Sequence, residues 1–183
     1  MNKQTLRFIT DTKTFSADTV RLRELLIHFA SCQAMNIAGL EAPIIDRLIE
    51  VGLVHSQYDL YLLSLDDLTV KAGLDPKQAH NLLEEIDKSR DVRLKCFIYA
   101  LGITGVDETA AQALAGRYVT VGCFITDSTM YDLTCLRDVD ASTARRIVTY
   151  LNNPANIDTL TKLHETLRII QPTLMGPGDS GVL

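Results

Sequence analysis

Apolar residues recur three or four positions apart along most of this chain, which is the spacing of one face of an α-helix. A stripe through Val20, Leu26 and Phe29 predicts a first helix, which Asp18 or Thr19 would cap. Further helices are predicted at residues 42–50, 76–88, 108–117, 141–151 and 157–167. The pattern therefore predicts an all-α chain of roughly ten to twelve short helices.

Shorter elements are predicted between these helices. The apolar pattern of residues 58–63 indicates a short helical turn. Ser64 and Asp67 have the spacing of a capping box, in which each side chain accepts a hydrogen bond from the other residue's backbone N–H. Another short helix is expected to begin at Asp127 or Ser128. These signals divide the chain into many short helical segments.

A short turn motif occurs four times, each time after an apolar stretch and before a predicted helix. The copies are Gly39-Leu40-Glu41, Gly73-Leu74-Asp75, Gly105-Val106-Asp107 and Asp138-Val139-Asp140. They lie about 33 residues apart, a period typical of a repeated supersecondary unit. A small residue, an apolar residue and a turn residue between two helices describe a helix-hairpin-helix, whose exposed N–H groups can bind a phosphate. We expect four such hairpins in two pairs, each pair sharing a core.

The composition fits a helical domain with an aliphatic core. The chain has 183 residues, of which 46% are hydrophobic, and it contains no Trp. This length predicts one domain, or two halves packed as one. The net charge is −5, whereas nucleic-acid binders usually have a basic face, so the charge argues mildly against tight DNA binding. The most basic segment, residues 88–95, joins the two halves and is either a solvated face or a rail for DNA.

Few residues are spaced for metal binding or catalysis. The cysteines, Cys32, Cys96, Cys123 and Cys135, form no CxxC pair, so reduced core thiols are predicted and zinc is not. The four histidines lack metal-ligand spacing, and nothing places a Ser, His and Asp together as a catalytic triad. No apolar run has the length of a signal peptide or a membrane span. We therefore predict a cytoplasmic protein with no cofactor and no membrane partner.

The segment HFASCQAMNIAGL, residues 28–40, closely resembles the start of the helix-hairpin-helix domain of bacterial NAD-dependent DNA ligases. Further matching motifs follow in order: LIEVGLV at 48–54, DLY at 59–61, KQAHNLL at 77–83, YALGI at 99–103 and ETA at 108–110. The resemblance covers about residues 20–170. It implies a tandem helix-hairpin-helix fold, also described as RuvA domain 2-like, for residues 18–171.

The ends of the chain lie outside this resemblance. Residues 1–17 form an N-terminal extension in which residues 5–9 predict a short strand. Residues 172–183 lack core material and predict a mobile tail. The start at Met1 and the ending GPGDSGVL favour a complete or deliberately shortened chain.

The resemblance implies a non-catalytic module that holds DNA. In the family, the hairpins contact the phosphates of a nicked duplex from the minor-groove side, through backbone N–H groups and without sequence preference. Carried over, these contacts fall on Gly39, Leu40, Glu41, Gly73, Leu74, Asp75, Lys77, Gly105, Val106, Asp107, Thr109, Val139, Asp140, Arg145 and Arg146. The implied role is in DNA replication and repair.

Three departures from the family pattern change what the resemblance implies. The chain has no K-x-D-G nucleophile motif, so it is not expected to be an enzyme by itself. The last zinc-binding Cys of the family aligns with Asp18, and no Cys precedes Cys32. The second Gly of every hairpin is an acid: Glu41, Asp75, Asp107 or Asp140.

The four acids allow two interpretations, and these lead to different functions. Asp75, Asp107 and Asp140 are well suited to cap the helices that follow them, whereas Glu41 is a poorer cap. An acid at this corner also repels a phosphate, so DNA binding is predicted to be weak or lost. The alternatives to a ligase-type DNA-binding module are a protein-interaction or regulatory module on the same scaffold, and an accessory subunit that supplies a DNA clamp in trans.

Overall fold

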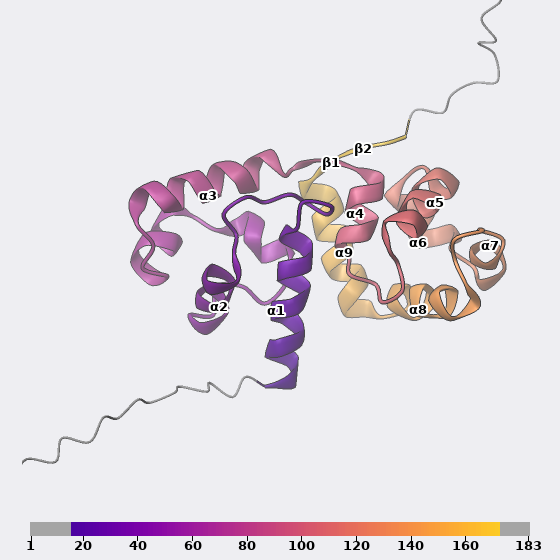
Figure 1. Ribbon diagram of the computed structural model, residues 1–183, viewed down its shortest axis with the longest axis horizontal. Coiled ribbons are helices and arrows are strands. Elements are labelled where there is room, and N and C mark those ends of the chain that lie inside the picture. The colour runs from indigo at the N-terminus through magenta and orange to yellow at the C-terminus, as the bar shows by residue number, and fades with distance from the viewer. Residues whose placement is uncertain (1–15, 173–183) are drawn as a thin grey trace, which may run out of the picture.

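The computed structural model describes residues 16–172, which form a mostly helical molecule (Figure 1). In chain order the elements are α1 (Ala17–Ala30), α2 (Ala42–Glu50), the 3-10 helix η1 (Tyr58–Leu62), the π-helix η2 (Asp67–Lys71), α3 (Pro76–Lys88), β1 (Asp91–Arg93), α4 (Leu94–Ala100), α5 (Glu108–Tyr118), α6 (Val121–Asp127), α7 (Met130–Thr134), α8 (Ala141–Leu151), α9 (Pro154–Thr166) and β2 (Arg168–Ile170). The predicted all-α class is confirmed. The strand predicted at 5–9, and all of the predicted tail except residue 172, lie outside the described residues.

Several helix boundaries follow from local signals and lie where the sequence predicts them. Helices α2, α3 and α8 have the predicted bounds, and α5 extends one residue beyond its predicted end, to Tyr118. Pro76 occupies the first turn of α3, where its missing N–H costs nothing. The predicted capping box is also present. The backbone N–H of Ser64 donates to the Asp67 carboxylate at 3.0 Å, and that of Asp67 donates to the Ser64 hydroxyl at 3.2 Å.

Other boundaries differ from the prediction because a neighbouring hydroxyl is the cap. Helix α1 begins at Ala17, and its cap is Ser16, not Asp18 or Thr19. Val20, placed on the core stripe by its spacing, is 41% exposed. Helix α7 is capped by Thr129, so neither Asp127 nor Ser128 begins it. Asp127 instead ends α6, which the apolar pattern did not indicate.

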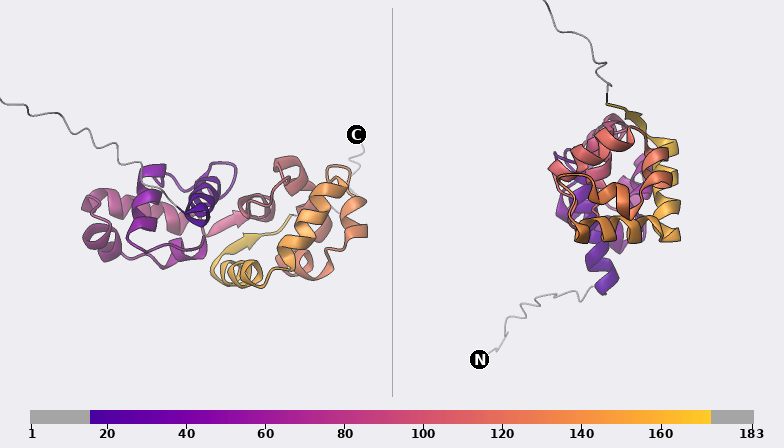
Figure 2. Two further views of the ribbon diagram at one scale, coloured as in Figure 1. Left: turned by 90° about the horizontal axis from the view of Figure 1, so that it is seen from below. Right: turned by 90° about the vertical axis from the view of Figure 1, so that its right-hand side faces the viewer.

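The helices gather at two ends of an elongated molecule (Figures 1 and 2). At one end lie α2, α3 and η2, at the other lie α5 to α8, and α1, η1, α4 and α9 lie between them. We call the two turns of the first end, 39–41 and 73–75, with their helices the first hairpin pair. The turns 105–107 and 138–140 with their helices are the second hairpin pair. Buried apolar side chains from both pairs belong to one core cluster.

Each pair is tied together by a hydrogen bond to the backbone of a turn. In the first pair, Arg47 Nε of α2 donates to the carbonyl oxygen of Ala72 at 3.0 Å. In the second pair, the Thr143 hydroxyl of α8 donates to the carbonyl oxygen of Gly105 at 3.4 Å. The pairing expected from the sequence is therefore present in the structure.

Helix α1 joins the first pair to the second. Gly102, at φ +66°, follows α4, and a Cβ there would lie 2.6 Å from Leu25 Cδ1 of α1. His28 Nε2 lies 2.7 Å from the Tyr99 carbonyl oxygen, within hydrogen-bonding distance. Only a residue without a side chain lets α1 approach this closely. The contact fixes the position of α1 relative to the third hairpin.

Two short parallel strands, β1 and β2, pair at the link between the two hairpin pairs. β1 pairs with β2 in the register Asp91 to Arg168 through Arg93 to Ile170. Arg168 Nε and Nη2 also donate to the two carboxylate oxygens of Asp91, at 2.6 and 2.7 Å. The segment after α9 therefore returns to the link between the two hairpin pairs.

The prediction that the four cysteines are core thiols is wrong. Cys32, Cys123 and Cys135 are exposed and Cys96 is half-buried, so none of the four lies in the core. Within residues 16–172, no group of His, Cys, Asp and Glu side chains is arranged to hold a metal ion. Every helix of this part of the chain is too short or too polar to cross a membrane.

Candidate nucleic-acid interface

The four turns share an apolar residue but not the same backbone geometry. Gly39, Gly73 and Gly105 have φ of +81°, +74° and +91°, values that side chains disfavour, whereas Asp138 in the fourth turn does not have a positive φ. The central residues Leu40, Val106 and Val139 are buried and Leu74 is half-buried. The apolar residue therefore fills the gap between the helices, as the motif predicts.

Three of the four acids act as helix caps. The Asp75 carboxylate accepts from the N–H groups of Lys77 at 2.9 Å and Gln78 at 3.3 Å. Asp107 accepts from the N–H of Ala110 at 2.8 Å, and Asp140 from that of Thr143 at 2.6 Å. These bonds use N–H groups that a phosphate would otherwise contact.

Two details refine this description of the acids. The backbone hydrogen bond from Thr143, and then the bond from its side chain, hold the pKa of Asp140 below its usual value. Glu41 makes no side-chain cap hydrogen bond, although it occupies the cap position of α2. The sequence interpretation of Asp as a cap and of Glu as a poorer cap therefore agrees with the hydrogen bonds.

The turns of the first pair open onto a hollow of about 660 Å³ that is mostly acidic. Its charged lining residues are Glu41, Asp75, Lys77, Glu84 and Glu85, and we call it the acidic hollow. Two of these carboxylates have a side-chain partner nearby: His80 Nε2 lies 3.3 Å from Glu84, and Lys88 Nζ lies 2.6 Å from Glu85. Lys77 is the single Lys or Arg in the lining and forms no salt bridge within residues 16–172.

The second pair borders a larger cleft of about 900 Å³, and its charge is the opposite. Its charged lining residues are Arg21 and Glu24 of α1 and Arg145 and Arg146 of α8, with His28 beside them, and we call it the arginine cleft. Arg146 lies over the third turn, since a Cβ on Gly105 would be 3.0 Å from its Nη1. The cleft therefore lies between the two hairpin pairs.

The arginines of the arginine cleft form no salt bridge within residues 16–172, although the charge of Arg146 helps to lower the pKa of Asp140. Eight other Lys and Arg side chains of residues 16–172 form salt bridges. Within the same range, Arg21, Arg145 and Arg146 form none. An Arg without a carboxylate partner keeps all its N–H donors for water or for an anion.

The basic segment 88–95 is partly neutralised. Lys88 pairs with Glu85, and Arg90 pairs with Asp87 at 3.0 Å while donating to the carbonyl oxygen of Tyr61 at 3.2 Å. Arg93 is exposed and has no salt bridge within the described range. This segment mainly holds the junction together, so it does not form a continuous rail of free cations.

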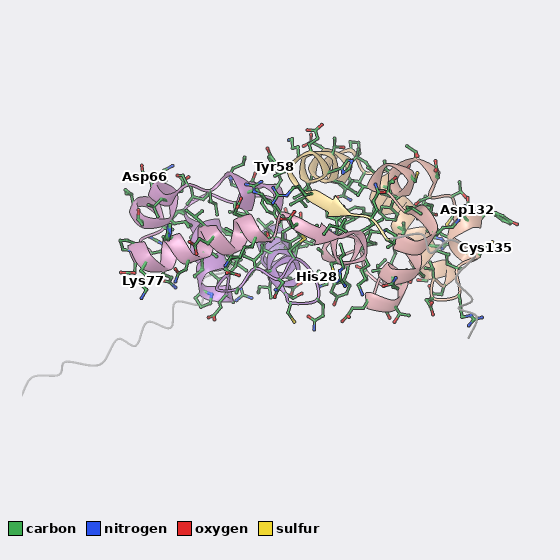
Figure 3. The ribbon with its side chains drawn as sticks, turned by 90° about the horizontal axis from the view of Figure 1, so that it is seen from above. His28, Tyr58, Asp66, Lys77, Asp132 and Cys135 are labelled. Atoms are coloured by element: carbon green, nitrogen blue, oxygen red, sulfur yellow. The ribbon has the colours of Figure 1, made fainter. Side chains whose placement is uncertain are left out.

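Seven of the fifteen residues predicted to contact DNA line one of the two cavities. Gly39, Glu41, Asp75 and Lys77 line the acidic hollow, whereas Val106, Arg145 and Arg146 line the arginine cleft. Figure 3 shows Lys77 at one end of the molecule and His28 near its middle. The remaining predicted contacts line neither cavity: Leu40, Gly73, Leu74, Gly105, Asp107, Thr109, Val139 and Asp140.

Sequence reasoning did not identify Arg21 as part of a site. Its only local signal was its position on the polar side of the first helix. Arg21, Leu25 and His28 are spaced four and then three residues apart, so they share one face of α1, and all three line the cleft. Their spacing in the sequence could have placed these three residues on one face of a helix. It could not have shown which part of the molecule that face contacts.

Comparison with known proteins gives two results. A family model described as a helix-hairpin-helix motif matches residues 96–160, which lie mainly in the second hairpin pair. The chain is also 40% identical to a DNA ligase of Pelotomaculum thermopropionicum over 82% of its length. It is 41% identical to a DNA ligase of Trichlorobacter lovleyi and 36% identical to one of Geobacter sulfurreducens, over 78% of its length in each case. It covers only 21 to 22% of these relatives.

Proposed function

Because this chain is a relative of the helix-hairpin-helix region of bacterial DNA ligases, we propose that it binds the DNA backbone without sequence preference. It would serve as a non-catalytic module in DNA replication and repair, with a nicked duplex as its ligand. The observation that carries the proposal is the arginine cleft, where Arg145 and Arg146 follow the fourth turn without a salt-bridge partner in the described residues.

The second hairpin pair supplies most of the proposed contact surface. A guanidinium presents its N–H donors in a planar fork that matches two oxygens of a phosphate. Arg145 and Arg146 lie in the second turn of α8, and both line the arginine cleft. Each phosphate they neutralise releases a counterion from the duplex, so binding is expected to weaken steeply with salt.

The capping acids reduce this affinity without abolishing it. Asp107 and Asp140 bond to the backbone of their own helices, which satisfies N–H groups that would otherwise contact a phosphate. Backbone N–H contacts are therefore expected to contribute less than the arginines. The proposed binding is weak, electrostatic and centred on the second pair.

The test is the fluorescence anisotropy of a labelled nicked duplex titrated with the protein at low and at physiological salt. We expect micromolar or tighter binding at low salt, and a steep loss of affinity as salt rises. A duplex of unrelated sequence should bind equally well. An anisotropy that stays flat at low salt would contradict the proposal.

A second function is favoured by the acidic hollow. The resemblance to DNA ligases implies a DNA contact at the turns of the first pair, but there four carboxylates around Lys77 form a negative surface. Such a surface suits a basic protein segment better than a phosphate. The same assay separates the two functions when all four turn acids are neutralised as Glu41→Gln, Asp75→Asn, Asp107→Asn and Asp140→Asn, since Asn remains a good cap. Binding by this variant but not by the wild type would favour the protein-interaction module.

A further inference from the structure

We propose that the arginine cleft is a phosphate-binding site built by both hairpin pairs, with Arg21 of α1 as its third cation. This inference rests on the proposed function and adds a residue outside the hairpin turns. Arg21 belongs to the first pair, whereas Arg145 and Arg146 belong to the second, and all three line one cavity. Neither pair by itself contains the complete set.

The position of Arg21 is set by tight packing of α1. Leu25 and His28, on the same face of α1, contact the segment between α4 and the third turn. A Cβ on Gly102 would lie 2.6 Å from Leu25 Cδ1, so no side chain separates the two elements. Arg21 stands one helical turn before Leu25 on the same face of α1, and both residues line the cleft.

The charges around Arg21 leave it available for an anion. Its neighbour Arg23 points elsewhere and is bound to Asp46 of α2, whereas Arg21 has no salt bridge within residues 16–172. Among residues 16–172, Glu24 is the only carboxylate that lines the cleft. Three cations against one carboxylate give the cavity a positive charge in a chain whose net charge is −5.

Neutral polar groups complete the lining. The cleft is also lined by the neutral side chains of Thr104, Thr149, Tyr150, Asn153 and Asn156. The Thr149 hydroxyl donates to the carbonyl oxygen of Arg145 at 2.8 Å, and one N–H of Asn156 donates to that of Tyr150 at 3.1 Å, so the hydroxyl of Thr104 and the amides of Asn153 and Asn156 keep donors for a ligand. Hydroxyl and amide donors around a cluster of arginines are the chemistry of a phosphate site.

The ligand that fits this chemistry is a phosphodiester of a nucleic-acid strand. The cleft holds about 900 Å³, which is room for a length of backbone and much more than one ion needs. It is continuous with the third hairpin turn, because Ile103, Thr104 and Val106 line it. A strand held at that turn would enter the cavity that Arg146 and Arg21 both line.

The experiment measures binding of the nicked duplex over a range of salt concentrations for Arg21→Gln and for the control Arg93→Gln. Each variant loses one cation that has no salt bridge within residues 16–172, but Arg93 is exposed on β1, at the link between the two hairpin pairs, and does not line the cleft. We expect Arg21→Gln to weaken binding at low salt about threefold to tenfold and to reduce the salt slope by about one. Arg93→Gln should leave both unchanged.

Each other outcome is informative. If the wild type binds DNA and Arg21→Gln behaves like Arg93→Gln, the inference is wrong and the proposed function stands. If the wild type does not bind, both are wrong. Inorganic phosphate is titrated at constant ionic strength as a separate arm. If it displaces no DNA at low millimolar concentration, the site requires a strand; if it competes there, the cleft is a free-phosphate site and the assignment to a strand is overturned.

Discussion

The two hairpin pairs have the same turn sequence pattern but opposite charges around it. In the first pair, the acidic hollow surrounds Lys77 with four carboxylates. In the second, Arg145 and Arg146 border a cleft with one carboxylate, Glu24. An acid at the turn itself is common to both, so it does not distinguish them. We propose that charged residues on the helices after the turns, and not the turn acids, determine which pair holds a phosphate.

The turns also differ in how closely they are packed. A Cβ placed on Gly39 or Gly73 would meet no atom within 4 Å, whereas on Gly105 it would lie 2.6 Å from Thr143 Oγ1. The third turn is thus enclosed by α8, and the first-pair turns are open. The same α8 that closes the third turn presents Arg145 and Arg146, so packing and charge are linked in the second pair.

The largest expected effect is on DNA affinity, when the two arginines that make the second pair positive are both replaced. We expect Arg145→Gln with Arg146→Gln to weaken binding of a nicked duplex at low salt by tenfold or more and to lower the salt slope by about two. Lys77→Gln, in the acidic hollow, should change the affinity less than twofold, because the carboxylates already offset its charge. Anisotropy titrations check both variants. Equal losses from the two would mean that both pairs contact DNA.

The next effect concerns the packing of the turns. Gly105→Ala should lower the free energy of unfolding by about 2–3 kcal/mol, because the new methyl group adds a clash with Thr143 to the strain of a positive φ. Gly39→Ala, at φ +81° but in open space, should lower it by about 1 kcal/mol. Urea denaturation measures both, with the m-value as a check that the unfolding transition is unchanged.

Equal losses in the two glycine variants would contradict the difference in packing. A second measurement distinguishes local from global damage. If Gly105→Ala displaces α8, it should also weaken DNA binding through Arg145 and Arg146, whereas Gly39→Ala should not. A Gly105→Ala variant that is destabilised but binds normally would separate the packing of the turn from the proposed site.

A smaller effect is expected from the caps. Asp107→Ala should lower the free energy of unfolding by about 1 kcal/mol, since it removes the bond to the N–H of Ala110. Glu41→Ala should change it by no more than a few tenths of a kcal/mol, because Glu41 makes no side-chain cap bond. Urea denaturation again provides the measurement. A large loss from Glu41→Ala would show that this residue stabilises the turn in another way.

Local signals predicted those parts of the fold that local interactions determine. The bounds of α3 follow from Asp75 and Pro76, and the capping box follows from Ser64 and Asp67. The start of α1 was missed because Ser16, Asp18 and Thr19 are all suitable caps, and the sequence does not rank them once tertiary packing acts.

Features that depend on contacts between distant residues could not be read from the pattern. The β1–β2 pair joins Asp91 to Arg168, 77 positions apart. The role that we propose for Arg21 depends on Gly102, which lets α1 approach the segment before the third turn. The cysteines were placed in the core because Cys is usually buried, but their surface positions depend on how the short helices pack. The sequence therefore indicated the two arginines beside a turn and not the third across the cleft.

The smallest expected effect is on the free energy of unfolding at acidic pH. It shows which carboxylate makes each hairpin pair sensitive to acid. Hydrogen bonds with the Lys71 side chain and with Ser64 lower the pKa of Asp67 in the first pair to about 2, and those from Thr143 lower that of Asp140 in the second. A folded pKa below the unfolded value means that the stabilisation is present above about pH 4 and is lost as the pH falls towards 2. Asp67→Asn should therefore flatten the dependence of stability on pH between about 4 and 2, and more strongly than Asp140→Asn.

The exposed neighbour Asp66, whose side chain does not cap η2, supplies the control variant Asp66→Asn, which should keep the wild-type slope. Urea midpoints measured at several pH values test this, and an equal slope for Asp67→Asn and the wild type would show that the capping box does not carry the acid sensitivity of the first pair.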